Sequence, residues 1–242
     1  MTPAFFITGT DTGVGKTLVT AALLRAYAAL GLRVLGMKPV AAGAESRDGV
    51  WINEDAALLR AASNVDAAAE WMNPYLFREA IAPHIAAERK GVEIEIPRIR
   101  AALEALQAQA DLVLVEGVGG FRVPLSATRD TADLAQALGL PIILVAGMRL
   151  GCLNHALLTV EAIAARGLTL AGWVANRIDP DMAAYDENLA ALARRIDAPL
   201  LAELPSMPNP DPARASGIFA PKRLLKLLPT PPLPHCKNQT RL

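Results

Sequence analysis

A phosphate-binding turn near the start of the chain is the clearest chemical signal. The segment FFITGTDTGVGKT joins an apolar run to a turn that ends in Gly15, Lys16 and Thr17. Backbone N–H groups of such a turn can surround phosphate oxygens, while the lysine reaches the outer phosphates and the threonine hydroxyl binds Mg²⁺. The usual spacing has a glycine where this chain has Thr10, and Gly9 stands one place earlier. The pattern indicates a variant phosphate loop, with an ordinary strand-to-helix turn as the alternative.

Three further polar residues could act on a bound nucleotide. Lys38 and Glu116 each end an apolar run, Glu116 is followed by the glycine-rich GVGG, and Asp55 lies near the start of a short helix. A carboxylate at the end of a buried strand can bind Mg²⁺ directly or through water. Plainer explanations also apply: a packed lysine with its head in water, an acid favoured at a helix start (Asp55 or Glu54), and a simple strand end.

Two more segments could contact a ligand. A glycine turn before Asn154, in RLGCLNHALLT, predicts a helix start that could hold a carboxylate. Asn176 ends an apolar run, where its amide could read the edge of a base. A plain helix cap and a turn-forming asparagine are equally good explanations. The histidines do not cluster, and Cys152 is more typical of packing than of a nucleophile, so neither a nucleophile triad nor a histidine-based metal site is indicated.

These residues need a fold that brings them to one edge. Apolar runs predict strands at residues 4–8, 34–38, 111–116, 141–146, 170–176 and 199–204. Alanine- and leucine-rich segments predict helices at residues 16–30, 54–62, 96–110, 154–167 and 182–195. Strands that are apolar throughout are typical of a parallel sheet buried on both faces, and their alternation with helices predicts a doubly wound α/β fold. Ligands of such sheets bind beyond the carboxyl ends of the strands.

Composition narrows the class of protein. The chain has 242 residues, 52% of them hydrophobic, which suits one α/β domain with a substantial core. The formal net charge of zero gives no sign of nucleic-acid or acidic-membrane binding. Two distant cysteines, no basic stretch before the first apolar run and no run long enough to span a membrane favour a protein of the reducing cytoplasm. We expect one domain over residues 1–228 and a proline-rich, disordered tail over 229–242.

Six segments in order resemble those of the dethiobiotin synthetase family. They are TGTDTGVGKT, KPVAAG, LVEGVGG, LGCLNHALLT, LTLAGWVAN and APLLAELP, and the resemblance spans about residues 5–205. It implies a P-loop NTPase-type fold with a mostly parallel sheet, and a homodimer whose substrate site lies at the subunit interface. It also implies a cytoplasmic ligase of biotin biosynthesis that uses ATP, Mg²⁺ and CO₂ to convert 7,8-diaminopelargonate into dethiobiotin. The implied route passes through a carbamate and a carbamic-phosphoric mixed anhydride.

The resemblance also implies a role for individual residues. The expected catalytic residues are Lys16 and Lys38, with Lys38 stabilising the carbamate and the transferred phosphoryl group, and the expected Mg²⁺ ligands are Thr17, Asp55 and Glu116. The expected ATP-binding residues are Thr12, Gly13, Val14, Gly15, Lys16, Thr17, Leu18, Asp55, Glu116, Gly117, Val118, Gly119, Asn176, Arg177, Pro205, Ser206 and Met207. The expected substrate-binding residues are Thr12, Lys38, Ala42, Gly119, Gly151, Cys152, Leu153 and Asn154, the last four from the neighbouring subunit.

Two departures and two rival functions remain. The family often has Glu where this chain has Gly13, and Ser where it has Ala42. One rival is a related P-loop amidoligase or a kinase of a small acid. The other is a partner-switching ATPase of the ParA/MinD type, but such proteins carry a second lysine where this chain has Asp11. Hydrolysis that requires a diamine and bicarbonate, rather than a protein partner, would separate these possibilities.

Overall fold

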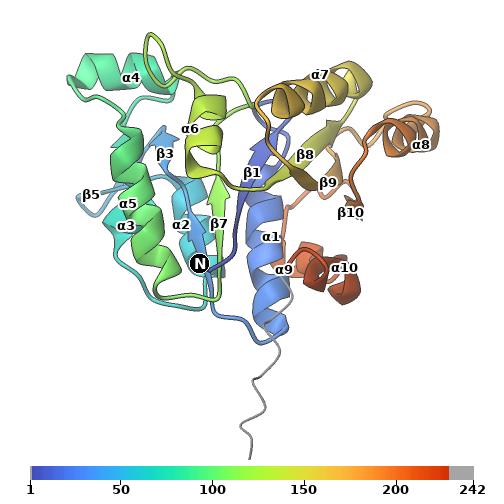
Figure 1. The fold of residues 1–242 in the computed structure, drawn as a ribbon, viewed down its shortest axis with the longest axis horizontal. Helices are drawn as coiled ribbons and strands as arrows, with labels where there is room; N and C mark the ends of the chain where they lie inside the picture. The colour runs from blue at the N-terminus through green and yellow to red at the C-terminus, as the bar shows by residue number, and fades with distance from the viewer. Residues whose placement is uncertain (1, 229–242) are drawn as a thin grey trace, which may run out of the picture.

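A parallel six-stranded sheet forms the centre of the computed structural model, which describes residues 2–228 (Figure 1). The strand order is β10-β9-β8-β1-β7-β2, and every neighbouring pair is parallel. The strands are β1 (Ala4–Gly9), β2 (Val34–Met37), β7 (Leu112–Glu116), β8 (Ile142–Met148), β9 (Leu170–Arg177) and β10 (Leu200–Leu204). The predicted doubly wound α/β fold is therefore confirmed.

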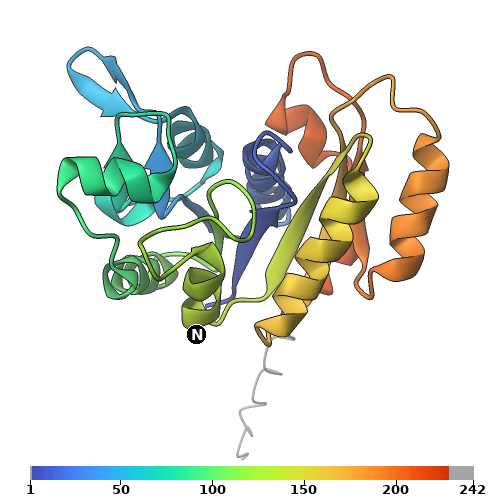
Figure 2. The same ribbon diagram turned by 90° about the horizontal axis from the view of Figure 1, so that it is seen from above.

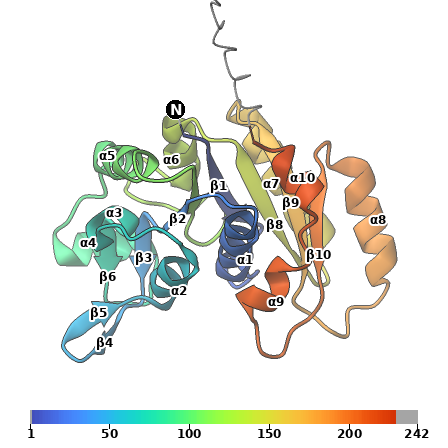
Figure 3. The same ribbon diagram turned by 90° about the horizontal axis from the view of Figure 1, so that it is seen from below.

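Helices cover both faces of this sheet because its strands are apolar on both sides. Phe5 and Ile7 pack on one face among α1, α2, α9 and α10, while Phe6 packs on the other with α5 and α6. A third cluster joins β8 and β9 to α7 and α8. Figures 1 and 3 show α9 beside α1. These helices are α1 (Lys16–Ala29), α2 (Glu54–Ala62), α5 (Ile96–Gln107), α6 (Thr131–Leu138), α7 (Cys152–Ala165), α8 (Tyr185–Arg195), α9 (Pro212–Ser216) and α10 (Pro221–Leu225).

A layer of short elements follows β2 and was not predicted. The parallel pair β3 (Val40–Ala42) and β6 (Tyr75–Phe77) places Ala42 opposite Phe77, and the antiparallel pair β4 (Glu45–Arg47) and β5 (Val50–Ile52) projects beside it. Helices α3 (Ala69–Met72) and α4 (Pro83–Lys90) complete this layer. Its strands have only three residues each, so they are too short to show a periodic pattern.

The carboxyl ends of the central strands meet at one edge of the sheet. In Figure 1 the arrowheads of β1 and β7 point to the top of the view, and Figure 2 is seen from that side. The register pairs Ile7 of β1 with Glu116 of β7, and Met37 of β2 with Val115. The phosphate loop, the residue after β2 and the glycine segment after β7 are therefore neighbours in space, as the sequence predicts.

Some expected boundaries differ. Lys38 lies just after β2 rather than within it, and α7 begins at Cys152, so Asn154 is not its N-cap residue. Residues 207–217 are proline-rich and have no periodic pattern, yet they contain α9, whose first turn is capped by the Asp211 carboxylate accepting from Ala213 N at 2.8 Å. The predicted tail at 229–242 lies outside the described residues. None of the helices described has the length and hydropathy needed to cross a membrane.

Candidate functional site

Two glycines in the left-handed region shape the phosphate loop between β1 and α1. Gly13 has a φ of 74° and Gly15 a φ of 87°, conformations that glycine adopts far more readily than other residues. Gly15 is the N-cap residue of α1, so the helix begins at Lys16 and its first N–H groups have no acceptor within the helix. The backbone therefore has the form of an anion-binding turn.

Gly9 and Thr10 explain the variant spacing of this loop. A Cβ atom on Gly9 would lie 2.7 Å from Val14 Cγ2 and 3.1 Å from Lys16 Cδ, so only glycine leaves room for the loop to fold back. Thr10 N donates to the carbonyl oxygen of Val145 at 3.0 Å, and the Thr10 hydroxyl accepts from Gly147 N at 3.3 Å. Both contacts tie the start of the loop to β8.

Asn176, at the end of β9, supports the same loop. Its side-chain Nδ2 donates to the carbonyl oxygen of Val14 at 2.8 Å, in a buried position. The sequence predicts that this amide reads a base edge. In the structure, one amide hydrogen is used by the loop, which leaves the second hydrogen and the carbonyl oxygen for a base. Asn176 is thus first a residue that holds the loop in place.

Lys16 is buried at the start of α1. Its Nζ donates to the carbonyl oxygen of Asp11 at 3.1 Å. Burial, and then the positive charge of Lys38, lower the pKa of Lys16 to about 8, against an opposing effect of Glu116, Asp55 and Asp11. Within residues 2–228 its hydrogen bond goes to a neutral carbonyl oxygen rather than to a carboxylate, and a phosphate would supply an anionic partner.

Lys38 lies between two carboxylates. Its Nζ donates to Glu116 Oε1 at 2.5 Å, to Asp55 Oδ2 at 2.9 Å and to the carbonyl oxygen of Gly117 at 3.2 Å. The Lys38 side chain is only 3% exposed, and that of Glu116 is fully buried. Burial alone would lower the pKa of Lys38, but the charges of Glu116 and Asp55 outweigh it and raise that pKa. Lys38 is therefore a buried cation whose charge is balanced by its neighbours.

Thr17 joins the same carboxylates. Its hydroxyl oxygen lies 2.8 Å from Asp55 Oδ1 and 2.9 Å from Glu116 Oε1, with one hydrogen to share between them. Glu116 Oε2 is buried and has no hydrogen-bond partner among the described residues. The sequence thus predicts correctly that Thr17, Asp55 and Glu116 come together. Residues 2–228 contain no cluster of three or more His, Cys, Asp or Glu side chains suited to a metal ion.

Two asparagines that sequence reasoning missed hold the backbone around Lys38 and Ala42. Asn73 Nδ2 donates to the carbonyl oxygen of Lys38 at 2.6 Å, and Lys38 N donates to Met72 O at 2.7 Å. Asn53 Nδ2 donates to the carbonyl oxygen of Ala42 at 3.1 Å, while its Oδ1 caps α2, the helix that carries Asp55. An asparagine directly before the acidic start of a helix is a common N-cap signal that could have identified Asn53, but nothing in the sequence indicates its contact with Ala42.

One cavity joins the phosphate loop to the layer of short elements. Its volume is about 710 Å³. Residues 80–83 and Val123, which form the wall away from the loop, could not be identified as site residues from the sequence, because they are small or apolar. The cavity is lined by Thr12, Gly13, Gly15, Lys16, Thr17, Lys38, Ala42, Asp55, Ala80, Ile81, Ala82, Pro83, Val118, Gly119 and Val123.

The remaining expected site residues lie outside that cavity. Asn176 pairs with Leu204 in the register of β9 and β10, so residues 205–207 follow directly beside it. The Arg177 guanidinium stacks over the Tyr185 ring at 4.5 Å and donates to Pro180 O at 2.8 Å, which turns it toward the segment before α8.

The residues expected to bind a carboxylate form the start of α7. Gly151 is its N-cap residue with a φ of 92°, Cys152 is buried, and Leu150 is 93% exposed. These residues do not line the cavity of their own chain. Arg149, just before them, donates from Nη2 to Asp11 Oδ2 at 2.7 Å, which links this segment to the phosphate loop.

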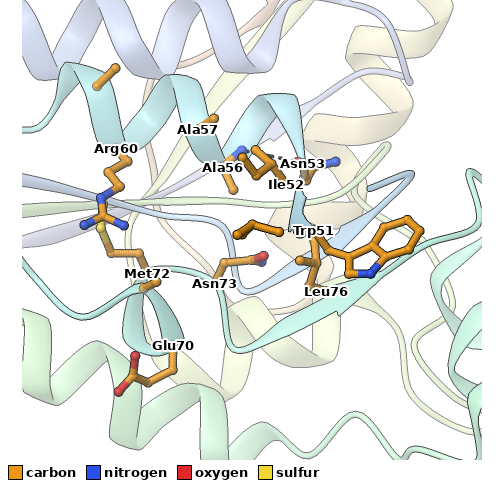
Figure 4. A pocket seen from close by; sticks show the side chains of 13 residues that line it. Trp51, Ile52, Asn53, Ala56, Ala57, Arg60, Glu70, Met72, Asn73 and Leu76 are labelled. Carbon is orange, nitrogen blue, oxygen red and sulfur yellow. Dashed lines mark hydrogen bonds between the residues drawn. The ribbon is translucent and has the colours of Figure 1, made fainter. Parts of the chain in front are cut away.

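A second pocket is lined by residues from β5, α2, α3 and β6 (Figure 4). Its volume is about 580 Å³, and it shares no lining residue with the first cavity. Trp51, Met72 and Leu76 give it a mainly apolar wall, with Arg60 at one end. Because Met72 and Asn73 also hold the Lys38 backbone, this pocket adjoins the support of the site rather than its chemistry.

Comparisons with known proteins agree with this geometry. A protein from Aromatoleum aromaticum named ATP-dependent dethiobiotin synthetase BioD is 65% identical over 88% of this chain and 95% of its own length. A protein of the same name from Nitrosospira multiformis is 55% identical over 90% of this chain and 95% of its own length. A family model described as AAA domain matches residues 3–214.

Solved structures support the fold. A MinD cell division protein from Aquifex aeolicus has a TM-score of 0.55 at 17% identity, covering 93% of this chain and 96% of its own. The septum site-determining protein MinD from Pyrococcus horikoshii, solved with Mg-ADP, has a TM-score of 0.53 at 20% identity, covering 94% and 89%. These likenesses show the P-loop NTPase fold alone. The identities to the curated relatives go further, and on them this chain belongs to the ATP-dependent dethiobiotin synthetase family.

Proposed function

We propose that this chain uses ATP and CO₂ to close the ring of dethiobiotin from 7,8-diaminopelargonate in biotin biosynthesis. The family to which it belongs makes it an ATP-dependent ligase. The observation that carries the proposal is the single cavity that runs from the phosphate loop to Ala42 and residues 80–83. A triphosphate on the loop and a small diamine at the far wall would face each other across Lys16 and Lys38.

The reaction that we propose has three balanced steps. The N7 amine of the diamine attacks CO₂ and loses a proton, which gives a carbamate. A carbamate oxygen attacks the γ-phosphorus of ATP, the bond to ADP breaks, and a carbamic-phosphoric anhydride forms. The second amine then attacks the carbonyl carbon, phosphate leaves, a proton is lost and the ureido ring closes.

The protein's contribution is mostly positioning and charge. Phosphoryl transfer to a carbamate brings two anions together, so fixed cations near both lower the barrier. Lys16 would contact the outer phosphates, since it lies at the base of the loop and its ammonium contacts a neutral carbonyl oxygen rather than a carboxylate among the described residues. Lys38 would stabilise the carbamate and the transferred group, since it lines the same cavity.

Mg²⁺ fits the residues that are present. Thr17, Asp55 and Glu116 would hold it, and the unpartnered Glu116 Oε2 supplies a free buried acceptor. Mg²⁺ in nucleotide enzymes commonly uses one or two carboxylates together with substrate phosphates and water, which suits a site with only two acidic side chains. When bound, the ion would neutralise charge on the phosphates.

The adenine of ATP and the carboxylate of the diamine would lie farther from the phosphate loop. Asn176, Arg177 and residues 205–207 would surround the adenine, which is supported by their adjacency at the ends of β9 and β10. Residues 151–154 would hold the diamine's carboxylate across the interface of a homodimer. This is supported by the absence of these residues from the cavity of their own chain and by the exposed Leu150. We also propose that the enzyme acts in the cytoplasm.

The test is ADP release with Mg-ATP and bicarbonate, with and without 7,8-diaminopelargonate, together with detection of dethiobiotin by mass. We expect release that depends on the diamine and that is lost in Lys38→Ala. Lys90→Ala is the matched control, because Lys90 is exposed and lies outside the cavity. Diamine-independent hydrolysis would contradict the proposal and favour a switch ATPase, and turnover of another acid would favour a related ligase or kinase.

A further inference from the structure

The cluster around Lys38 has a property that the proposed reaction does not use. A lysine ammonium has three hydrogens, and the acceptors around Lys38 number three: Glu116 Oε1, Asp55 Oδ2 and Gly117 O. In this arrangement no hydrogen is left for a carbamate or a phosphoryl oxygen. The ammonium must leave at least one of these acceptors before it can contact a substrate.

The acceptors that hold Lys38 are also the carboxylates expected to hold Mg²⁺. Asp55 and Glu116 each carry one negative charge, and each contacts both the Lys38 ammonium and the Thr17 hydroxyl. Two carboxylates this close repel each other, and a buried one without a cation is strongly destabilising. A positive charge between them therefore stabilises the pair, whether it comes from Lys38 or from a metal ion.

We infer that Lys38 is a placeholder cation: it neutralises Asp55 and Glu116 in the nucleotide-free protein and is released toward the cavity when a divalent cation binds these carboxylates. The inference rests on the proposed metal-binding role of Asp55 and Glu116. It adds that metal binding to these carboxylates is coupled to the release of the Lys38 ammonium toward the cavity. Metal and lysine compete for the same charge, so the lysine becomes available only in the nucleotide-loaded site.

Geometry supports such a movement. Lys38 lines the cavity, so its side chain, although only 3% exposed, borders the space into which the ammonium would move. Its backbone is fixed by Met72 and Asn73, so the change is confined to the side chain. The carboxylates are held independently, Glu116 by β7 and Asp55 by the capped helix α2, so they stay in place when the ammonium leaves.

Mn²⁺ binding to the nucleotide-free protein tests this inference without any turnover. The EPR signal of free Mn²⁺ gives the dissociation constant for the wild type and for Lys38→Met. Because a neighbouring positive charge is removed, we expect Mn²⁺ to bind at least about ten-fold more tightly to Lys38→Met. Lys90→Met, which changes an exposed lysine, should match the wild type. Adding Asp55→Asn to Lys38→Met should abolish the gain.

Equal or weaker Mn²⁺ binding by a folded Lys38→Met protein would overturn the inference. If that variant does not fold, an NMR measurement on the wild type tests the inference instead. The ¹⁵N signal of its Lys38 ammonium, assigned by its loss in Lys38→Arg, should shift on adding Mg²⁺ with a non-hydrolysable ATP analogue, but not on adding the analogue with EDTA. An unchanged signal in the loaded protein would also overturn it. Neither readout uses the diamine, so failure here is distinguishable from failure of the proposed function.

Discussion

Arg149 donates from Nη2 to Asp11 Oδ2 at 2.7 Å, and this ion pair joins the start of the phosphate loop to the segment that precedes α7. The other carboxylate oxygen of Asp11 accepts from Thr12 N at 2.7 Å, so one side chain holds both segments. In the proposed function these segments bind the triphosphate and the diamine's carboxylate. The pair is half-exposed, so it contributes little to stability, and its effect should be on position.

We therefore expect Asp11→Asn and Arg149→Met each to lower kcat/KM for ATP by about 3- to 10-fold, with little change in Tm. Because both remove the same contact, the double variant should be no worse than the more affected single variant. Steady-state kinetics over the double-mutant cycle measure this. Multiplicative effects would show that the two residues act separately. Arg47→Met, which breaks an exposed pair with Glu54, is the control and should leave kcat/KM unchanged.

Substitution of Ala42 is expected to improve substrate binding rather than weaken it. It lines the cavity beside Lys38, and its place in β3 is fixed by pairing with Phe77 and by the Asn53 amide. A hydroxyl at this position would add one hydrogen bond to a bound diamine, worth about 0.5–1.5 kcal/mol, so Ala42→Ser should lower KM for the diamine by roughly 2- to 12-fold. The same change at exposed Ala61 should have no effect. An unchanged or higher KM in Ala42→Ser would show that the substrate does not contact this residue.

Lys16 predicts proton uptake on nucleotide binding. Burial and Lys38 hold its pKa at about 8 in the nucleotide-free protein, despite the carboxylates of Glu116, Asp55 and Asp11. A phosphate beside the amine favours the charged form, so ADP binding at about pH 8.5 should take up part of a proton, and at about pH 6.5 almost none. The buffer dependence of the calorimetric binding enthalpy measures this uptake. Affinity for ADP should fall as the pH rises above about 8.

The Lys16→Arg variant separates this amine from other titrating groups. Arginine stays charged throughout this range, so the variant should take up fewer protons at about pH 8.5 than the wild type. Uptake that is the same in both proteins would assign the proton to another group.

The lowered pKa of Lys16 also sets how the free energy of unfolding depends on pH. The unfolded chain holds the Lys16 proton up to about pH 10.5, so the burial penalty is full below about pH 8 and is relieved as the pH rises between the two values.

Much of this site could be predicted because its residues end long apolar strands. Glu116 follows four buried residues of a parallel strand, and a parallel sheet brings such ends together. The contacts of Asn73 and Asn53 could not be predicted, because they join irregular segments that pair only through three-residue strands. The wall at residues 80–83 has no chemical signature. For Asn176 the sequence predicts contact with a base, with a turn-forming role as the alternative. Its bond to Val14 could not be predicted, because it depends on how the loop folds back.

Gly13 and Gly15 allow the loop's backbone strain to be separated from its packing. Both have positive φ, so an alanine at either costs about 1–2 kcal/mol of backbone strain. A Cβ on Gly13 meets nothing within 4 Å, whereas one on Gly15 would lie 2.2 Å from Asn176 Nδ2. Gly15→Ala must therefore also displace the amide that donates to Val14 O. We expect Gly15→Ala to raise the Kd for ATP clearly more than Gly13→Ala does.

Truncation of Asn176 provides the decisive comparison for that loop. Asn176→Ala alone should weaken ATP binding, because it removes the bond that holds the Val14 carbonyl. Combined with Gly15→Ala it removes the clash as well, so the double variant should bind ATP better than the product of the single effects predicts. Fluorescence titration with a labelled ATP analogue measures all four proteins. Strictly additive free energies would mean that Gly15 is required only for its φ, and that Asn176 acts on the nucleotide rather than on the loop.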